Sequence, residues 1–181
     1  MRVSARVSTA VACLLIAAAG PAAAQSVGEK TGVNSLIGVS PSTQDFVTQA
    51  AISDLFEIQT SELALERADE PTKAFARKMI EDHRKISDEM KMILQSGKVQ
   101  AEVPKALDSS HQSKLDTLKG LNGPDFTKQY HDDQVRGHKN AADLYKRYAE
   151  GGDNAELKAF ATKNKPHIDE HLKMAQELDK K

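Results

Sequence analysis

Apolar side chains recur at helical spacing along four long stretches of the chain, with polar or charged side chains between them. The stretches run from about residue 43 to 68, 71 to 96, 124 to 150 and 153 to 179. A shorter helical stretch covers residues 109 to 121, and proline or glycine stands near each break. This pattern predicts an all-α protein: an up-down-up-down four-helix bundle with a short extra helix between the second and third long helices.

Two of the predicted helices begin with residues that cap helix N-termini. Ser42, with Asp45 three residues later, is expected to cap the first long helix. Asp153, with Glu156 in the following turn, is expected to cap the fourth. These caps place the start of the bundle domain at residue 42, and we assign residues 42–181 to that domain.

The first 24 residues have the pattern of an export signal. Arg2 and Arg6 form a basic start, an uncharged apolar run follows, and three alanines at 22–24 form a site that a signal peptidase accepts. The alternative is an uncleaved membrane anchor, which the Gly20-Pro21 pair and the alanine-rich end disfavour. We therefore predict a signal peptide over residues 1–24 and a periplasmic mature protein.

The mature chain is predicted to begin with a flexible leader. Residues 25–41 contain glycine, serine and proline without a sustained period. The single cysteine, Cys13, lies inside the predicted signal peptide, so the mature chain can form neither a disulfide nor a thiolate site. Its stability must therefore come from packing.

Charge and hydropathy narrow the range of partners. Removing Arg2 and Arg6 from the 25 basic residues leaves 23 against 26 acidic ones, a net charge of about −3. This balance disfavours nucleic-acid binding, which usually requires a concentrated basic face. We predict no transmembrane segment in the mature chain, and the sequence leaves any protein or envelope partner open.

Histidines stand where the helical pattern would place core residues. His83 lies at the centre of the apolar stripe of the second long helix, at a position typical of leucine. His131 and His138 lie on the predicted inward stripe of the third, and His167 and His171, one turn apart, on that of the fourth. The pattern therefore predicts a polar layer shared by three helices.

A carboxylate from the first long helix would complete such a layer. Glu57, His83 and His138 each lie roughly 20 Å from the same end of the bundle at 1.5 Å per residue. Glu62 lies within the apolar arc of its helix, whereas Glu57 borders small residues, so both are candidates. Imidazole and carboxylate are suitable ligands for zinc, copper, iron or nickel, and facing helices can supply them. The pattern is compatible with one transition metal ion at mid-bundle.

Two other interpretations account for the same histidines. In the first, they hydrogen-bond one another, Gln134, Asn164 and Tyr130 in a buried layer that sets the helix register. In the second, they form a pH sensor, because several desolvated histidines would be neutral near pH 7 and their charging in acid would loosen the bundle.

Four segments carry a family resemblance: TGVNSLIGVSPSTQDFVTQAAISDLFEIQTSELAL, KAFARKMIEDH, LNGPDFTKQYHDDQVRGH and KPHIDEHLKMAQEL. Together they resemble the exported bacterial domain-of-unknown-function family 4142, which is labelled a predicted outer-membrane protein and is related to ferritin-like bundles. The resemblance implies a periplasmic ferritin-like four-helix bundle, connected with stress or the cell envelope, with no established biochemical activity.

The resemblance also implies a set of site residues. It favours Glu57 over Glu62 and, with the helical pattern, gives four candidate metal ligands: Glu57, His83, His138 and His171. We expect no catalytic residue among them.

The di-iron pattern of ferritins is incomplete in this chain. That pattern needs Glu-x-x-His on two helices, but Ile80 and Ile168 stand where the glutamates should be. Ferroxidase chemistry is therefore disfavoured. The leading hypothesis is a periplasmic bundle with a non-catalytic binding or envelope-stress role and a metal site, and the alternative is a metal-dependent oxidoreductase of ferritin-like descent.

Overall fold

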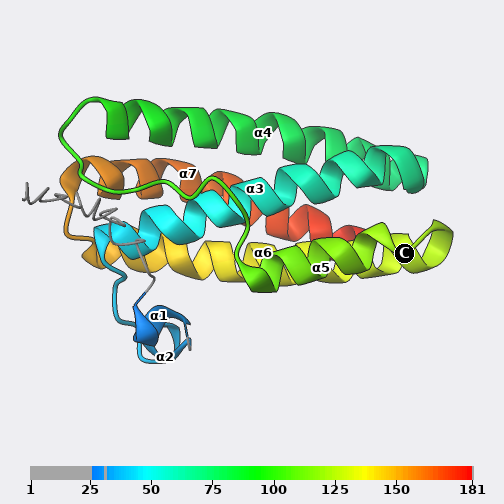
Figure 1. The fold of residues 1–181 in the computed structure, drawn as a ribbon, viewed down its shortest axis with the longest axis horizontal. Coiled ribbons are helices and arrows are strands. Elements are labelled where there is room, and N and C mark those ends of the chain that lie inside the picture. The colour runs from blue at the N-terminus through cyan, green and yellow to red at the C-terminus, as the bar shows by residue number, and fades with distance from the viewer. Residues whose placement is uncertain (1–25, 31, 181) are drawn as a thin grey trace, which may run out of the picture.

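The computed structural model describes residues 26–30 and 32–180, and every regular element in that part of the chain is a helix (Figure 1). Two short helices, α1 (Val27–Lys30) and α2 (Val33–Leu36), come first. The long helices are α3 (Thr43–Arg67), α4 (Glu70–Gln95), α6 (Gly123–Gly151) and α7 (Ala155–Leu178), with α5 (Ser109–Lys119) between α4 and α6. The prediction of an all-α bundle with a short extra helix is confirmed.

The predicted up-down-up-down order of the long helices is wrong in its second half. Figure 1 shows the connection after α4 running back along the bundle and through α5, so that α6 begins beside the end of α3. Arg67 at the end of α3 accordingly donates to the carbonyls of Lys119 and Leu121, at 2.8 and 2.9 Å. Helix α6 therefore runs parallel to α4, and the order is up-down-down-up. The physical reason is the length of the connection, because only a short loop forces consecutive helices to be antiparallel.

The helix caps were predicted correctly for α3 but not for α7. The Ser42 hydroxyl oxygen accepts the backbone N–H of Asp45 at 3.1 Å, as expected. At α7 the cap is Asn154, one residue after the predicted Asp153. The Asp153 carboxylate accepts the Thr43 hydroxyl instead, at 2.5 Å, and so joins the start of α3 to the α6–α7 turn.

The apolar core is divided into two clusters, one toward each end of the bundle. The first surrounds Phe46, whose ring lies 5.3 Å from that of Tyr145 and 6.3 Å from that of Phe160. The second contains Met79 and Phe126. Between the clusters lies a buried polar layer made of Asp54, Glu57, His83, Gln134, His138 and His171.

The N-terminal segment differs from the expected flexible leader. The predicted signal peptide lies outside the described residues, but residues 26–30 and 32–41 include α1 and α2, and this segment docks on the bundle. Glu29 is buried, and both of its carboxylate oxygens accept from Arg147 of α6, at 2.8 and 3.2 Å. Arg147 also donates to the Val39 carbonyl, at 2.7 Å. No helix in the described part of the chain has the length and apolarity needed to cross a membrane.

Replacing Arg147 with methionine should release this segment from the bundle. The change leaves the buried Glu29 carboxylate without its cation, so we expect the free energy of unfolding to fall by roughly 1 to 3 kcal/mol. Limited proteolysis should then cleave within residues 26–41 faster than in the unmodified protein. Lys146, an exposed lysine next to Arg147 on the same helix, provides the control, and Lys146→Met should change neither property. Equal protease resistance in both variants would show that the Glu29–Arg147 pair does not hold the segment.

Candidate metal centre

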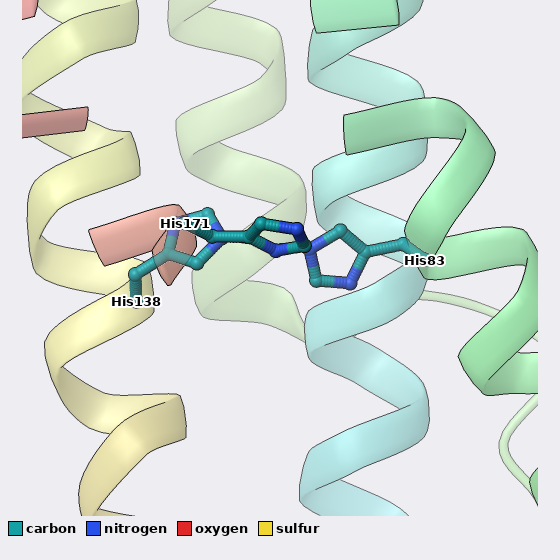
Figure 2. Close-up of side chains that lie close together, drawn as sticks. All are labelled: His83, His138 and His171. Atoms are coloured by element: carbon teal, nitrogen blue, oxygen red, sulfur yellow. The ribbon is translucent and has the colours of Figure 1, made fainter. Parts of the chain in front are cut away.

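Three histidines from three helices meet in the polar layer. His83 comes from α4, His138 from α6 and His171 from α7, and each is at most 1% exposed. Figure 2 shows the three rings directed toward one another in the centre of the bundle. The ring centroids lie 5.3 to 5.6 Å apart, and each residue offers one ligand atom within 4.8 Å of the other two.

Carboxylates orient two of the three rings from outside the cluster. His83 Nδ1 lies 2.8 Å from an oxygen of Asp54, whose other oxygen accepts the Ser87 hydroxyl at 2.8 Å. His171 Nε2 lies 3.0 Å from an oxygen of Asp82. An ionised carboxylate can only accept, so in each ring this nitrogen carries the hydrogen. The carboxylates thereby select the tautomer, as they do behind the histidine ligands of metal sites.

The backbone orients the third ring in the same way. His138 Nδ1 donates to the carbonyl of Gln134, one turn earlier in α6, at 2.9 Å. The lone pairs of His138 Nε2 and His83 Nε2 then face each other across 3.4 Å. Two lone pairs cannot form a hydrogen bond, so this contact requires a proton or a metal ion between the nitrogens. His171 Nδ1 is buried and has no hydrogen-bond partner among the described residues.

The charges around the layer decide where a proton binds. Burial lowers the pKa of His138 well below its usual range, and the neighbouring His83 lowers it further. Burial likewise lowers the pKa of His171 to about 4. Burial also opposes the charged form of His83, but the hydrogen bond and charge of Asp54 outweigh it and raise the pKa of His83. Of the three rings, His83 is therefore the one that most readily takes up a proton, and its Nε2 atom faces that of His138.

The separation of the His83 and His138 nitrogens matches that of two ligands of a tetrahedral ion. Ligand nitrogens at 2.0–2.1 Å from such an ion lie about 3.3–3.4 Å apart, and the Nε2 atoms of His83 and His138 are separated by 3.4 Å. Three nitrogen ligands leave one position of a tetrahedron for a further group.

Glu57 lies beside the histidine cluster and not within the group of close ligand atoms. It is buried, and its Oε2 atom has no hydrogen-bond partner among the described residues. Burial raises the pKa of this carboxyl to about 7, although His83 acts to lower it. A Cβ atom at Gly137 would stand only 2.8 Å from Glu57 Oε1, so the glycine makes room for the carboxyl. Glu62 is exposed and accepts from Arg84, which leaves Glu57 as the inward glutamate.

Two of the five histidines predicted to face inward lie away from this cluster. His167 is exposed, because it lies about 60° around the helix from the buried Asn164, just outside the buried face of α7. His131 is half-buried, and its Nε2 atom is 2.8 Å from the Thr72 hydroxyl.

Other members of the predicted hydrogen-bond network also have partners elsewhere. Tyr130 pairs with the Ser61 hydroxyl, and Asn164 donates to Glu89 and to the carbonyl of Phe160. Sequence reasoning missed Asp54, although it stands one turn before Glu57 on the same side of its helix.

Comparisons with known proteins give one match. A family model described as a domain of unknown function (DUF4142) matches residues 29–178, which is most of the chain. No curated protein and no solved structure matches.

Replacing Asp54 with alanine should destabilise the metal-free protein. The change leaves the Nδ1 hydrogen of His83 and the Ser87 hydroxyl without their acceptor, at a cost of roughly 1 to 3 kcal/mol in the free energy of unfolding. Urea denaturation in the presence of a chelator measures this cost. Glu62→Ala, which removes an exposed carboxylate from the same helix, should change stability by less than about 0.5 kcal/mol. If the two variants were equally stable, Asp54 would not be what holds His83.

Proposed function

The chain belongs to the DUF4142 family, and we propose that it is an exported, periplasmic helical bundle that binds one transition metal ion in its centre. His83, His138 and His171 would hold the ion. The proposed role is non-catalytic binding in the cell envelope, where a site of this kind fits storage, buffering or a response to stress.

One observation carries this proposal. Each of the three buried imidazoles has one ring nitrogen held by an oxygen outside the cluster, and among the described residues the remaining three nitrogens have no hydrogen-bond partner other than one another. A layer that served only to set helix register would pair these nitrogens with hydrogen-bond donors, since unpaired buried polar atoms are costly. A cation satisfies all three at once.

The proposed site holds one ion and not two. Di-iron bundles carry a Glu-x-x-His motif on each of two helices, so that a glutamate stands three residues before each ligand histidine. Ile80 and Ile168 occupy those places here, on α4 and α7. The single long connection between the second and third long helices is nevertheless the chain order of ferritin-like bundles, which supports descent from them.

Glu57 is the proposed fourth ligand. Its carboxyl is buried beside the histidines, and its Oε2 atom has no partner among the described residues, so no existing hydrogen bond must break for it to bind an ion. Three imidazoles and one carboxylate form a donor set suited to Zn²⁺, Cu²⁺ or Ni²⁺, and the 3.4 Å separation of the His83 and His138 nitrogens, which is that of two tetrahedral ligands, favours Zn²⁺ among these.

The burial of the layer favours binding over catalysis. A catalytic metal keeps a coordination position open to substrate, whereas a structural or storage site is closed. The three histidines are almost fully buried, and Glu57 as the proposed fourth ligand would cover the remaining position. The alternative, an oxidoreductase, would require this carboxylate to move aside during each turnover.

Titration with Zn²⁺ tests the metal proposal. We expect one equivalent to bind and to raise the melting temperature, because an ion that binds only the folded state stabilises it. His171→Ala should weaken binding at least about 100-fold, since it removes a ligand and leaves the chelate incomplete. Isothermal titration calorimetry of the full mature chain measures both affinities.

A matched control is available one turn away on the same helix. His167 is exposed and outside the cluster, so His167→Ala should bind Zn²⁺ within about twofold of the unmodified protein. Equal weakening by the two substitutions would mean that surface histidines account for the binding. Failure of the unmodified protein to bind Zn²⁺, Cu²⁺ or Ni²⁺ would overturn the proposal.

Export is tested by the N-terminus of the protein made in the cell. The periplasmic fraction should contain a chain that begins at Gln25, since the three alanines at 22–24 form the predicted cleavage site. Mass spectrometry of the intact protein gives the answer. Changing Ala22 and Ala24 to arginine should block cleavage and retain the longer chain in the membrane fraction. A full-length chain in the cytoplasmic fraction of the unmodified strain would refute export.

A further inference from the structure

A groove on one side of the bundle leads down to Glu57. Its volume is about 700 Å³, and it lies between α3 and α6 beneath the segment 104–111 and the start of α5. Its lining includes four carboxylates, from Glu29, Glu57, Asp108 and Asp133, and the amino group of Lys114. Glu29 is paired with Arg147 and Asp133 with Arg136, which leaves Glu57 and Asp108 as the carboxylates without a lysine or arginine partner, and none of the three cluster histidines forms part of the wall.

Glu57 and Gly137 form the boundary between this groove and the histidine cluster. Both line the groove. Glu57 Oε1 occupies the space that a side chain at position 137 would fill, and the residue after Gly137 is the cluster histidine His138. On the other side, Glu57 is close enough to His83 for the two charges to interact. The carboxyl thus contacts both the groove and the buried layer.

We infer that the groove is the access route of the metal ion and that Glu57 is the first ligand an incoming divalent cation meets. The inference rests on the proposed metal site and adds the path by which that closed site is filled and emptied. The cation would bind the Oε2 atom of Glu57, which has no hydrogen-bond partner among the described residues, and then be passed to the nitrogens of the three histidines. Glu57 would remain as the fourth ligand.

On the opposite side of the cluster, the contacts of Asp82 with Lys78 and His171 hinder the entry of a cation. There Asp82 is partly exposed, but its Oδ2 atom accepts from Lys78 at 2.8 Å and from His171 at 3.0 Å. An incoming ion would have to displace the positive charge of Lys78 and break the bond that orients His171. The groove imposes neither requirement.

A bulky side chain at Asn140 tests the route without altering any proposed ligand. Asn140 is exposed, lines the groove and lies one turn after Gly137 on α6. Helical side chains lean toward the N-terminus of their helix, so Asn140→Trp should place its indole over Gly137 and Glu57. Thr162→Trp, at an exposed position of α7 outside the groove, is the control.

The measurement is the rate of Co²⁺ uptake, followed by stopped-flow absorbance, and the rate of Co²⁺ release into excess chelator. A blocked route slows entry and exit equally, so Asn140→Trp should reduce both rates by about tenfold or more and leave the dissociation constant within about twofold. Thr162→Trp should behave as the unmodified protein does. Circular dichroism and melting temperature verify that both variants are folded.

Lys78→Met addresses the opposite side. If ions enter past Asp82, removing the Lys78 charge should accelerate uptake while Asn140→Trp has no effect, and that result would overturn the inference while leaving the metal site intact. Unchanged uptake in both variants would overturn it as well. Absence of Co²⁺ binding to the unmodified protein would instead refute the metal site, and with it the route.

Discussion

The nitrogen atoms of three buried imidazoles impose the constraint on which the centre of this protein depends. A buried polar nitrogen without a hydrogen-bond partner is costly. In each ring of the cluster, one of the two nitrogens has its partner, an oxygen atom that lies outside the cluster. Asp54, Asp82 and the Gln134 carbonyl thereby orient the rings, and orientation leaves the other nitrogens facing one another. Only a proton or a cation resolves that arrangement, so the same hydrogen bonds that stabilise the fold also prepare the site.

The organisation of the core follows from this layer. The two apolar clusters stabilise the ends of the bundle, and the layer between them contributes little hydrophobic burial of its own. The clusters nevertheless set the position of the helices, and Met79 and Ile86 of α4 place His83 at the level of its partners. The long connection through α5 covers one side of the bundle and forms part of the groove, so the feature that reverses α6 also shapes the access to Glu57.

Helical periodicity was sufficient to predict the four long helices and the inward position of His83, because His83 has apolar neighbours on both sides along its stripe. It was insufficient for His167, which lies at the edge of the buried face, where one step of 100° separates core from solvent. Glu57 and Glu62 could not be separated by pattern alone, since both border apolar residues. The direction of α6 could not be predicted, because it depends on the path of a long connection. The Glu29–Arg147 pair joins residues 118 positions apart, so no local sequence pattern indicates it.

The sequence analysis placed Glu57, His83 and His138 at the same level along the bundle, although it assumed the wrong direction for α6. The placement of His138 holds for a geometrical reason. His138 lies near the middle of α6, so its level changes little when the helix is reversed. Anomalous diffraction at the zinc absorption edge shows whether one ion binds all three histidines of the cluster. We expect a single peak inside the bundle, about 2.0–2.1 Å from one nitrogen each of His83, His138 and His171. Peaks confined to the surface, or none in crystals grown with Zn²⁺, would contradict it.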